Sequence, residues 1–231
     1  MKKRDFNNKI LQINCDKNEQ KYSGSCFILK ANDKLFLVTA SHVAKEMNIE
    51  SYIYINNPIT SHPFRINIKD LNYLNSWFFH PYSDVAIMKI NNSTINYKDS
   101  DENEKSLLIE ELAFEVDVDK YATNEEVNIN DILFMYGCPE VILDFPMIPF
   151  IVECKIVVET WKKLHNGIYF ECFLLDHPSA QGFSGGPVLK FDDDTFNIVG
   201  IIHGNHVDNT GGKFAIIIPI KYIIELIKIL Q

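Results

Sequence analysis

The sequence lacks the surplus of positive charge that a nucleic-acid-binding protein needs. It contains 22 Lys and Arg residues against 31 Asp and Glu residues, which gives a formal net charge of −9. A protein that binds nucleic acid neutralises phosphates with a patch or stripe of basic side chains. The one basic cluster, at residues 2–4, is short and terminal, and we interpret it as a solvated tail. We therefore expect no nucleic-acid partner.

Cysteine is scarce and badly placed for a disulfide framework. The five cysteines are odd in number and widely and irregularly spaced: Cys15, Cys26, Cys138, Cys154 and Cys172. This spacing also fits no zinc site, so we expect reduced and mostly buried thiols and no disulfide. Reduced thiols are typical of the cytoplasm, and we expect a cytoplasmic location.

Long hydrophobic runs are absent as well. No stretch of 18 apolar residues exists that could span a membrane, and the polar residues 1–9 do not look like a secretory signal. The apolar segment 216–230 is interrupted by Pro219 and by three charged residues. We therefore expect neither a membrane partner nor a signal peptide.

The sequence is rich in short apolar strands separated by turn residues. Six strands are followed by a polar stretch at 91–105, six further strands and a helical stripe at 221–230. The expected strands lie at 10–15, 25–30, 34–39, 52–55, 64–71 and 85–90, and at 132–136, 151–160, 168–174, 186–191, 197–203 and 213–218. This spacing indicates an all-β protein of sandwich or barrel type. We expect two lobes, residues 1–98 and 113–231, joined by a linker at 99–112.

The strongest local signal is the sequence GFSGGP at residues 182–187. A serine nucleophile needs backbone N–H groups beside it to bind the oxyanion that forms when it attacks a carbonyl carbon. Glycines near Ser184 allow the tight turn that brings such groups together. We expect Ser184 to be the nucleophile and the amides of Gly182 and Ser184 to form the oxyanion hole. The alternative is a glycine-rich turn that only connects two strands.

Serine is a weak nucleophile and needs a base, for which His42 is the candidate. His42 follows the apolar strand at 35–41, which would hold it rigidly at the edge of a cleft. Asp84 directly precedes the apolar strand at 85–90, where a buried carboxylate needs a partner. Singly, these residues also fit a structural histidine and a turn-forming acid. Together with Ser184 they form a candidate catalytic triad, in which His42 should lie within hydrogen-bond reach of both partners.

These motifs resemble those of the trypsin/chymotrypsin superfamily of serine proteases. The resemblance rests on VTASH at 38–42, SDVA at 83–86 and GFSGGP at 182–187, in the chain order His, Asp, Ser. Weaker similarity brings its extent to residues 22–231. It implies two six-stranded antiparallel β-barrels with a C-terminal helix, and no metal or organic cofactor.

The resemblance also implies a serine endopeptidase that works through an acyl-enzyme intermediate. Ser184 would attack the scissile carbonyl, His42 would take and return the proton, and Asp84 would fix the imidazole tautomer. The expected partner is a protein or peptide substrate, and regulation by a partner protein is left open. The alternative function is a catalytically silent module that keeps the protease fold and only binds.

The sequence departs from the family pattern in two places. Phe183 stands where zymogen-type members have an acid, so we expect its ring to pack under the nucleophile loop and the chain to be active without N-terminal cleavage. Pro178 stands where trypsin-like members have the acid that binds Arg or Lys. The candidate substrate pocket consists of Pro178, Ser179, Gln181, His203 and Gly204.

Two interpretations of His203 remain open. It lies on the strand where glutamate- and glutamine-selective relatives place a pocket histidine, although one residue away from that position. It also stands where the family usually has a serine or threonine beside the catalytic Asp, which favours a structural histidine near Asp84. A metal site with His206 lacks a third ligand, and we expect none.

Overall fold

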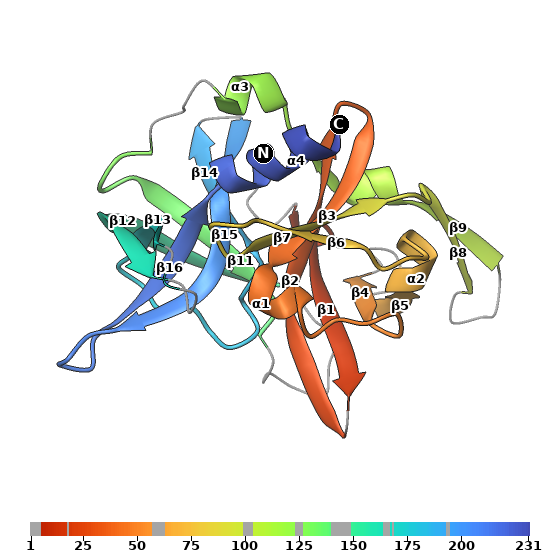
Figure 1. Cartoon of the computed structure of the whole chain (residues 1–231), viewed down its shortest axis with the longest axis horizontal. Coiled ribbons are helices and arrows are strands. Elements are labelled where there is room, and N and C mark those ends of the chain that lie inside the picture. Colours follow the sequence, from red (N-terminus) through yellow and green to blue (C-terminus); the bar gives the residue numbers. More distant parts are fainter. Residues whose placement is uncertain are drawn as a thin grey trace.

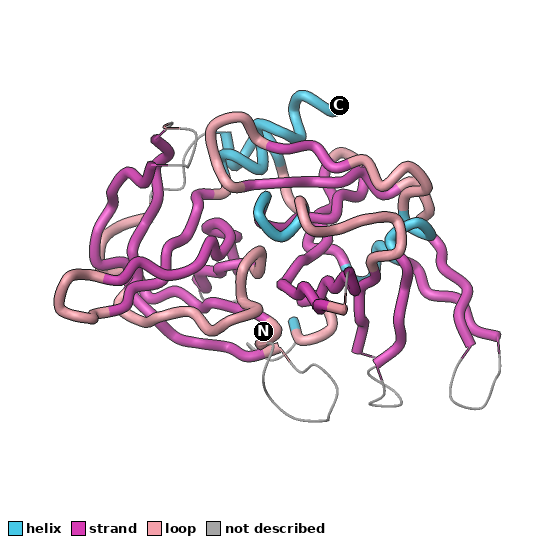
Figure 2. Tube along the Cα trace, turned by 60° about the horizontal axis from the view of Figure 1, so that its bottom comes forward, coloured by secondary structure: helices cyan, strands magenta, loops and turns pink. Residues whose placement is uncertain are grey.

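The apolar runs of the sequence form strands in the computed structural model. The structure describes residues 6–17, 19–56, 63–98, 104–122, 127–139, 149–163, 167, 169–192 and 195–231. Figure 1 shows two β lobes, the first coloured red to yellow and the second green to blue. The turned view in Figure 2 shows strands in both lobes and the C-terminal helix along one side. The predicted fold class, an all-β chymotrypsin-like fold of two barrel-like lobes with a C-terminal helix, is confirmed, although the six strands expected for each barrel are found only in the second lobe.

The first lobe is built on an eight-stranded sheet. Seven strands follow the order β5-β4-β1-β2-β3-β7-β6, and β10 pairs with β2 in parallel. The strands are β1 (Ile10–Lys17), β2 (Gln20–Ala31), β3 (Lys34–Ala40), β4 (Tyr52–Asn56), β5 (Pro63–Asn67), β6 (Trp77–Phe79), β7 (Val85–Ile90) and β10 (Ala113–Glu115). The sheet thus has two strands more than the six expected, because the short β6 was not predicted and β10 joins from the far side of the polar stretch.

The second lobe is a closed barrel of six antiparallel strands in the order β11-β12-β13-β16-β15-β14. The strands are β11 (Ile132–Gly137), β12 (Phe150–Lys163), β13 (Tyr169–Leu175), β14 (Pro187–Asp192), β15 (Thr195–Val207) and β16 (Lys213–Pro219). Closure pairs every strand on both sides and leaves no exposed sheet edge. This lobe matches the predicted six-stranded barrel.

The expected linker contains regular structure. Strands β8 (Thr94–Lys98) and β9 (Glu104–Leu108) pair as an antiparallel hairpin, and a 3-10 helix, η2 (Ile109–Leu112), follows. Residues 99–103 lie outside the described residues. A polar stretch can form strands because pairing uses backbone groups, even though most β9 side chains are exposed. Strand β10, the first segment of the predicted second lobe, pairs with the sheet of the first lobe. The division of the chain into lobes at residues 98 and 112 stays a prediction.

The described part of the chain also contains four α-helices: α1 (Ser41–Ala44), α2 (Ile68–Leu71), α3 (Val118–Ala122) and α4 (Lys221–Leu230). The predicted stripe of α4 is buried at Ile223, Ile224 and Ile227, and the helix contacts β7 of the first lobe and α3. The C-terminal helix therefore ties the chain end back to the first sheet. None of the described helices is long and apolar enough to span a bilayer.

Candidate active site

His42 and Asp84 meet because β3 and β7 are antiparallel neighbours. The register pairs Ala40, the last residue of β3, with Val85, the first residue of β7. The start of α1 therefore lies beside the residue that precedes β7. The Ser41 hydroxyl donates to the Val85 carbonyl oxygen at 2.7 Å, and the Ser41 N–H donates to the Asp84 carbonyl oxygen at 3.0 Å. These bonds fix the two predicted residues next to each other.

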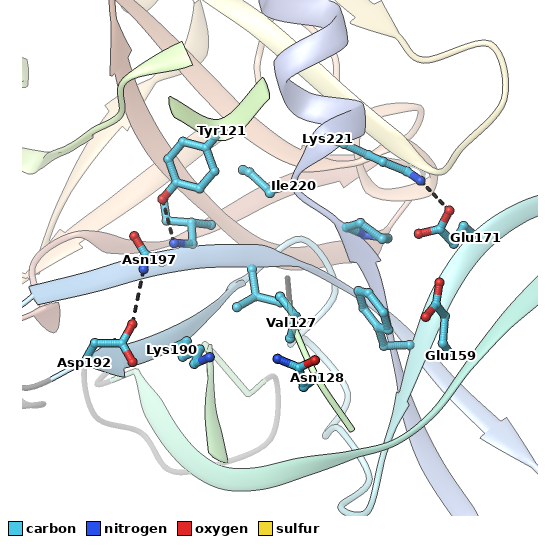
Figure 3. A pocket seen from close by; sticks show the side chains of 14 residues that line it. Tyr121, Val127, Asn128, Glu159, Glu171, Lys190, Asp192, Asn197, Ile220 and Lys221 are labelled. Atoms are coloured by element: carbon cyan, nitrogen blue, oxygen red, sulfur yellow. Dashed lines mark hydrogen bonds and ion pairs between the residues drawn. The ribbon is translucent and has the colours of Figure 1, made fainter. Parts of the chain in front are cut away.

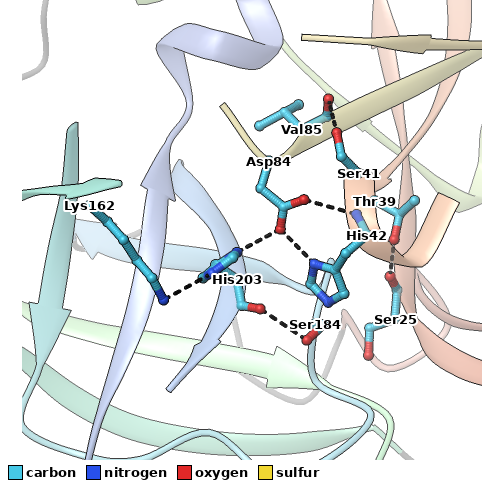
Figure 4. A network of polar contacts seen from close by, with 9 residues as sticks. All are labelled: Ser25, Thr39, Ser41, His42, Asp84, Val85, Lys162, Ser184 and His203. Carbon is cyan, nitrogen blue, oxygen red and sulfur yellow. Dashed lines mark hydrogen bonds and ion pairs between the residues drawn. The ribbon is translucent and has the colours of Figure 1, made fainter. Parts of the chain in front are cut away.

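Both oxygens of the Asp84 carboxylate are engaged (Figure 4). Oδ1 accepts the backbone N–H of His42 at 2.8 Å, and Oδ2 lies 2.6 Å from Nδ1 of the same histidine. Nδ1 of His203 lies 2.6 Å from that Oδ2 as well. Burial would raise the pKa of Asp84, but hydrogen bonds from His203 and His42 outweigh it and hold the pKa well below its usual range. Asp84 is therefore an anion at neutral pH.

Two consecutive turns carry Ser184 and explain the glycines of its motif. In the turns 180–183 and 183–186, the N–H of the fourth residue donates to the carbonyl oxygen of the first at 3.1 and 2.9 Å. The third residues, Gly182 and Gly185, have φ values of +91° and +87°. A positive φ at this position is typical of a type II turn and is unstrained in glycine. Ser184 is the second residue of the second turn.

The nucleophile loop, residues 180–186, is held against the first sheet. The Ser25 N–H donates to the Ser184 carbonyl oxygen at 2.8 Å, and the Ser25 hydroxyl donates to the Gly182 carbonyl oxygen at 2.7 Å. A Cβ on Gly185 would lie 2.1 Å from Oγ1 of Thr39 and 2.3 Å from the Ser25 carbonyl oxygen. Only glycine fits this approach, which places Ser184 beside the strand that leads into α1.

The Ser184 hydroxyl makes a different contact from the one expected. It donates to the carbonyl oxygen of His203 at 3.1 Å, and no hydrogen bond to His42 appears among the described residues. The predicted contact of His42 with Asp84 is confirmed, whereas the contact with Ser184 is not present here. The His42 side chain is 47% exposed, so its outer edge faces solvent. In unliganded enzymes such hydrogen bonds are often long and tighten when substrate binds.

His203 is the extra residue of a β-bulge. The register of β15 with β16 shifts between Ile202 and Gly204, and bulges of this kind redirect a side chain. Besides its contact with Asp84, the ring places Nε2 3.1 Å from Nζ of Lys162 on β12. The interpretation of His203 as a histidine beside Asp84 is confirmed. Its role in a substrate pocket stays a prediction.

Solved structures share this arrangement of lobes. The HtrA-type protease AlgW with tripeptide matches 96% of this chain with a TM-score of 0.57 and 16% sequence identity. The active form of the Rv3671c protease from M. tuberculosis matches 97% with a TM-score of 0.58 and 12% identity. The chain has a trypsin-like protease fold.

The extent of this likeness is limited. The chain spans 60% of the AlgW chain and 81% of the Rv3671c chain. No protein-family model matches the sequence, and no curated protein matches it. At these identities the likeness shows the trypsin-like fold alone.

The predicted pocket residues of this trypsin-like fold lie on two segments that contact each other. The Ser179 N–H donates to Oδ1 of Asn205 at 2.7 Å, and Nδ2 of Asn205 donates to the Ser179 carbonyl oxygen at 2.8 Å. Pro178 directly precedes Ser179, and Gln181 belongs to the first turn of the nucleophile loop. Gly204 follows the bulge with a φ of +151°. Their contact with substrate stays a prediction.

Phe183 lies beneath the nucleophile loop. Its side chain is 1% exposed and belongs to the apolar cluster inside the second barrel. A Cβ on Gly137 would lie 2.5 Å from Cγ of Phe183, so the ring rests on the backbone at the end of β11. The predicted packing of Phe183 is confirmed. Activity without N-terminal cleavage stays a prediction.

The five cysteines do not rival Ser184 as a nucleophile. All of them are free and buried, which is the arrangement expected of reduced thiols. Burial raises the pKa of Cys138 and of Cys154 to about 12, and that of Cys172 to about 11. Because the thiolate is the reactive form, such thiols are inert at neutral pH.

Sequence analysis missed several residues that fix the site. Ser25 bonds the nucleophile loop, and the Thr39 hydroxyl donates to its carbonyl oxygen at 2.7 Å. Nε2 of His80 lies 2.8 Å from Oε2 of Glu225, which fastens the turn before Asp84 to α4. A serine next to an apolar run signals a buried hydroxyl that needs partners, so Ser25 was detectable. The contact of His80 with α4 has no such local signal.

A separate hollow of about 700 Å³ lies between the closed barrel and the helices α3 and α4 (Figure 3). Its lining includes the ion pair of Lys221 with Glu171, and the Tyr121 hydroxyl that accepts the Ile198 N–H at 2.9 Å. None of the predicted site residues lines this hollow. The hollow is therefore distinct from the candidate active site.

Replacing Ser25 by Ala should destabilise the protein by about 1–3 kcal/mol, because two buried backbone groups lose their partner. The hydroxyl donates to Gly182 and accepts the Cys138 N–H at 2.8 Å. Urea unfolding of the variant measures the loss. The matched control is Ser23→Ala on the same strand, whose buried Oγ has no hydrogen-bond partner within the described ranges. Equal losses in both variants would refute the assigned role of Ser25.

Proposed function

We propose that this protein is a serine endopeptidase that cleaves peptide bonds through an acyl-enzyme intermediate. Ser184 is the nucleophile, His42 the base and Asp84 the orienting acid. The observation that carries the proposal is the contact of 2.6 Å between Nδ1 of His42 and Oδ2 of a buried, ionised Asp84. Ser184 lies beside this pair (Figure 4), in the second of the two turns that Gly182 and Gly185 make possible.

The proton path follows from these contacts. A carboxylate only accepts hydrogen bonds, so the proton of neutral His42 lies on Nδ1 and its acceptor is Nε2. In the substrate complex the Ser184 hydroxyl leaves the His203 carbonyl oxygen and donates to that acceptor. As Ser184 attacks the carbonyl carbon, its proton moves to Nε2, and the Asp84 anion stabilises the imidazolium. The imidazolium then protonates the leaving amine, and water releases the acyl group by the same route.

The amides of Gly182 and Ser184 serve as the oxyanion hole in this proposal. Neither N–H donates to an acceptor in the part of the chain that the structure describes. The carbonyl oxygens of the same two residues are held by Ser25, which fixes the loop. Donors that are fixed before the reaction stabilise the developing charge without reorganisation, and one such donor contributes about 10²- to 10³-fold in rate.

One observation favours the alternative, a silent binding module. The Ser184 hydroxyl bonds the His203 carbonyl oxygen rather than His42, and that carbonyl would hold it away from the base. Breaking the hydrogen bond to the His203 carbonyl oxygen costs only about 1 kcal/mol net, however, so this bond alone would not prevent catalysis. Activity decides between the two functions.

The test is cleavage of a diverse peptide library followed by mass spectrometry. We expect internal cleavage at a restricted set of bonds, in line with the peptide substrates that a protease fold accommodates and with the tripeptide in AlgW. Prior treatment with a fluorophosphonate should stop cleavage, and a metal chelator should leave it unchanged. An intact library, or cleavage that survives the fluorophosphonate, would refute the proposed function.

A further inference from the structure

Two histidines share the Asp84 carboxylate, and only one of them belongs to the proposed triad. Nδ1 of His42 and Nδ1 of His203 each lie 2.6 Å from Oδ2. The two rings meet edge to face with their centroids 5.6 Å apart. The side chains of Asp84 and His203 are only 7% and 19% exposed, so water competes little for this contact. His203 therefore belongs to the same hydrogen-bonded site as His42 and Asp84.

The partners of His203 determine where its proton lies. The nitrogen that faces Asp84 carries the proton, because a carboxylate only accepts hydrogen bonds. The acceptor of the neutral ring is then Nε2, which lies 3.1 Å from Nζ of Lys162. An ammonium group only donates. The contacts therefore form a directed chain, seen in Figure 4, in which Lys162 donates to His203 and His203 donates to Asp84.

Groups from several elements surround the His203 ring. Phe170 of β13 flanks the ring, with centroids 5.8 Å apart. The titratable groups that face the ring or Lys162 are His42 of α1, Asp84 before β7, Lys162 of β12 and Cys172 of β13. The Lys162 ammonium can only donate to Nε2, so the contact at 3.1 Å matches the tautomer in which Nδ1 of His203 donates to Asp84.

His203 also contacts the nucleophile, since its carbonyl oxygen accepts the Ser184 hydroxyl. Both contacts come from the extra residue of the β-bulge, whose carbonyl oxygen bonds Ser184 while its ring bonds Asp84. A serine or threonine at this place could donate its hydroxyl to the carboxylate. Its side chain lacks the second nitrogen with which the imidazole accepts from Lys162. The link between Lys162 and Asp84 therefore depends on the imidazole.

We propose that His203 and Lys162 are positioning residues that hold the Asp84 carboxylate in place for His42. The inference rests on the proposed function. His203 fixes Oδ2 by a charge-assisted hydrogen bond, and Lys162 fixes the tautomer of His203. Losing a hydrogen bond to a charged group should lower the reactivity of Ser184 by about 10- to 100-fold.

The experiment measures the rate of fluorophosphonate labelling of the full chain against pH. His203→Ala should lose about 10- to 100-fold, and His203→Asn, whose amide N–H can still reach Oδ2, should recover most of that loss. Lys162→Met removes the donor that fixes the tautomer of His203, so its labelling rate should lie between those of the wild type and His203→Ala. The matched control is Lys155→Met, an exposed lysine on the same strand, which should follow the wild-type profile.

Histidine ¹⁵N shifts of the resting protein supply a second readout that needs no activity. His203 should carry its proton on Nδ1 in the wild type, and a proton on Nε2 at neutral pH would overturn the inference. Wild-type protein that is not labelled would overturn the proposed function and this inference with it. Labelled wild type with the same rate and pH profile in His203→Ala would overturn the inference alone. If His203→Ala does not fold, Lys162→Met against Lys155→Met decides.

Discussion

Ser184→Ala should lower kcat/KM for a cleaved peptide by about 10⁴- to 10⁶-fold. The change removes the nucleophilic oxygen and leaves the remaining groups to catalyse only weakly. Within the described residues the hydroxyl makes one hydrogen bond, to the His203 carbonyl oxygen, so the loss of stability should be about 0.5–1.5 kcal/mol. Steady-state kinetics and urea unfolding measure the two effects.

The matched control for this experiment is Ser23→Ala, which removes from β2 a hydroxyl that has no hydrogen-bond partner within the described residues. It should keep wild-type kinetics. Turnover of Ser184→Ala close to the wild-type rate would mean that another group performs the chemistry, and the assignment of the nucleophile would be wrong.

Asp84→Asn should lower kcat by about 10⁴-fold. The Asn amide can donate a hydrogen bond where the carboxylate only accepts, and His42 then presents an unprotonated Nδ1 to it. The proton moves to Nε2, so the base has no free acceptor for the Ser184 proton. The fold should survive, because Asn keeps an oxygen for the His42 backbone N–H. Kinetics close to wild type would remove Asp84 from the triad.

The same variant tests the electrostatics of Asp84 without substrate. His203 and His42 lower its folded pKa against the effect of burial. A group of this kind stabilises the fold above its ordinary pKa of about 3.9, and the stabilisation is lost as the pH falls through the folded pKa. Asp84→Asn should therefore be less stable than the wild type at neutral pH, and the difference should shrink below about pH 4. Urea unfolding across this range would contradict the account if the difference stayed constant.

The parts of the site that sequence predicted are those set by local chemistry. Glycines around a serine indicate turns, and the structure places Gly182 and Gly185 at the positive φ positions of two of them. Ends of apolar strands indicate where polar side chains emerge, and His42 and Asp84 meet at the paired ends of β3 and β7. The two lobes were predicted from the spacing of the apolar strands, and the C-terminal helix from its apolar stripe. Both are local features of the sequence.

The parts that sequence did not predict depend on registers across the barrel. The bulge at His203 sets which way its ring points, and nothing in the local sequence marks the extra residue. Lys162 meets that ring only because β12, β13, β16 and β15 are neighbours in a closed barrel. The strand β10 was missed because it is three residues long and joins the first sheet across the polar hairpin. Such contacts are fixed by tertiary structure.

If His42, Asp84 and Ser184 act as one catalytic unit, the reactivity of Ser184 must depend on His42. Labelling of the wild-type chain and of His42→Ala with a fluorophosphonate, with the adduct mapped by peptide mass spectrometry, measures this dependence. We expect one adduct per chain, on Ser184, and almost none in His42→Ala. An adduct on another residue, or equal labelling of Ser184 without His42, would contradict this expectation.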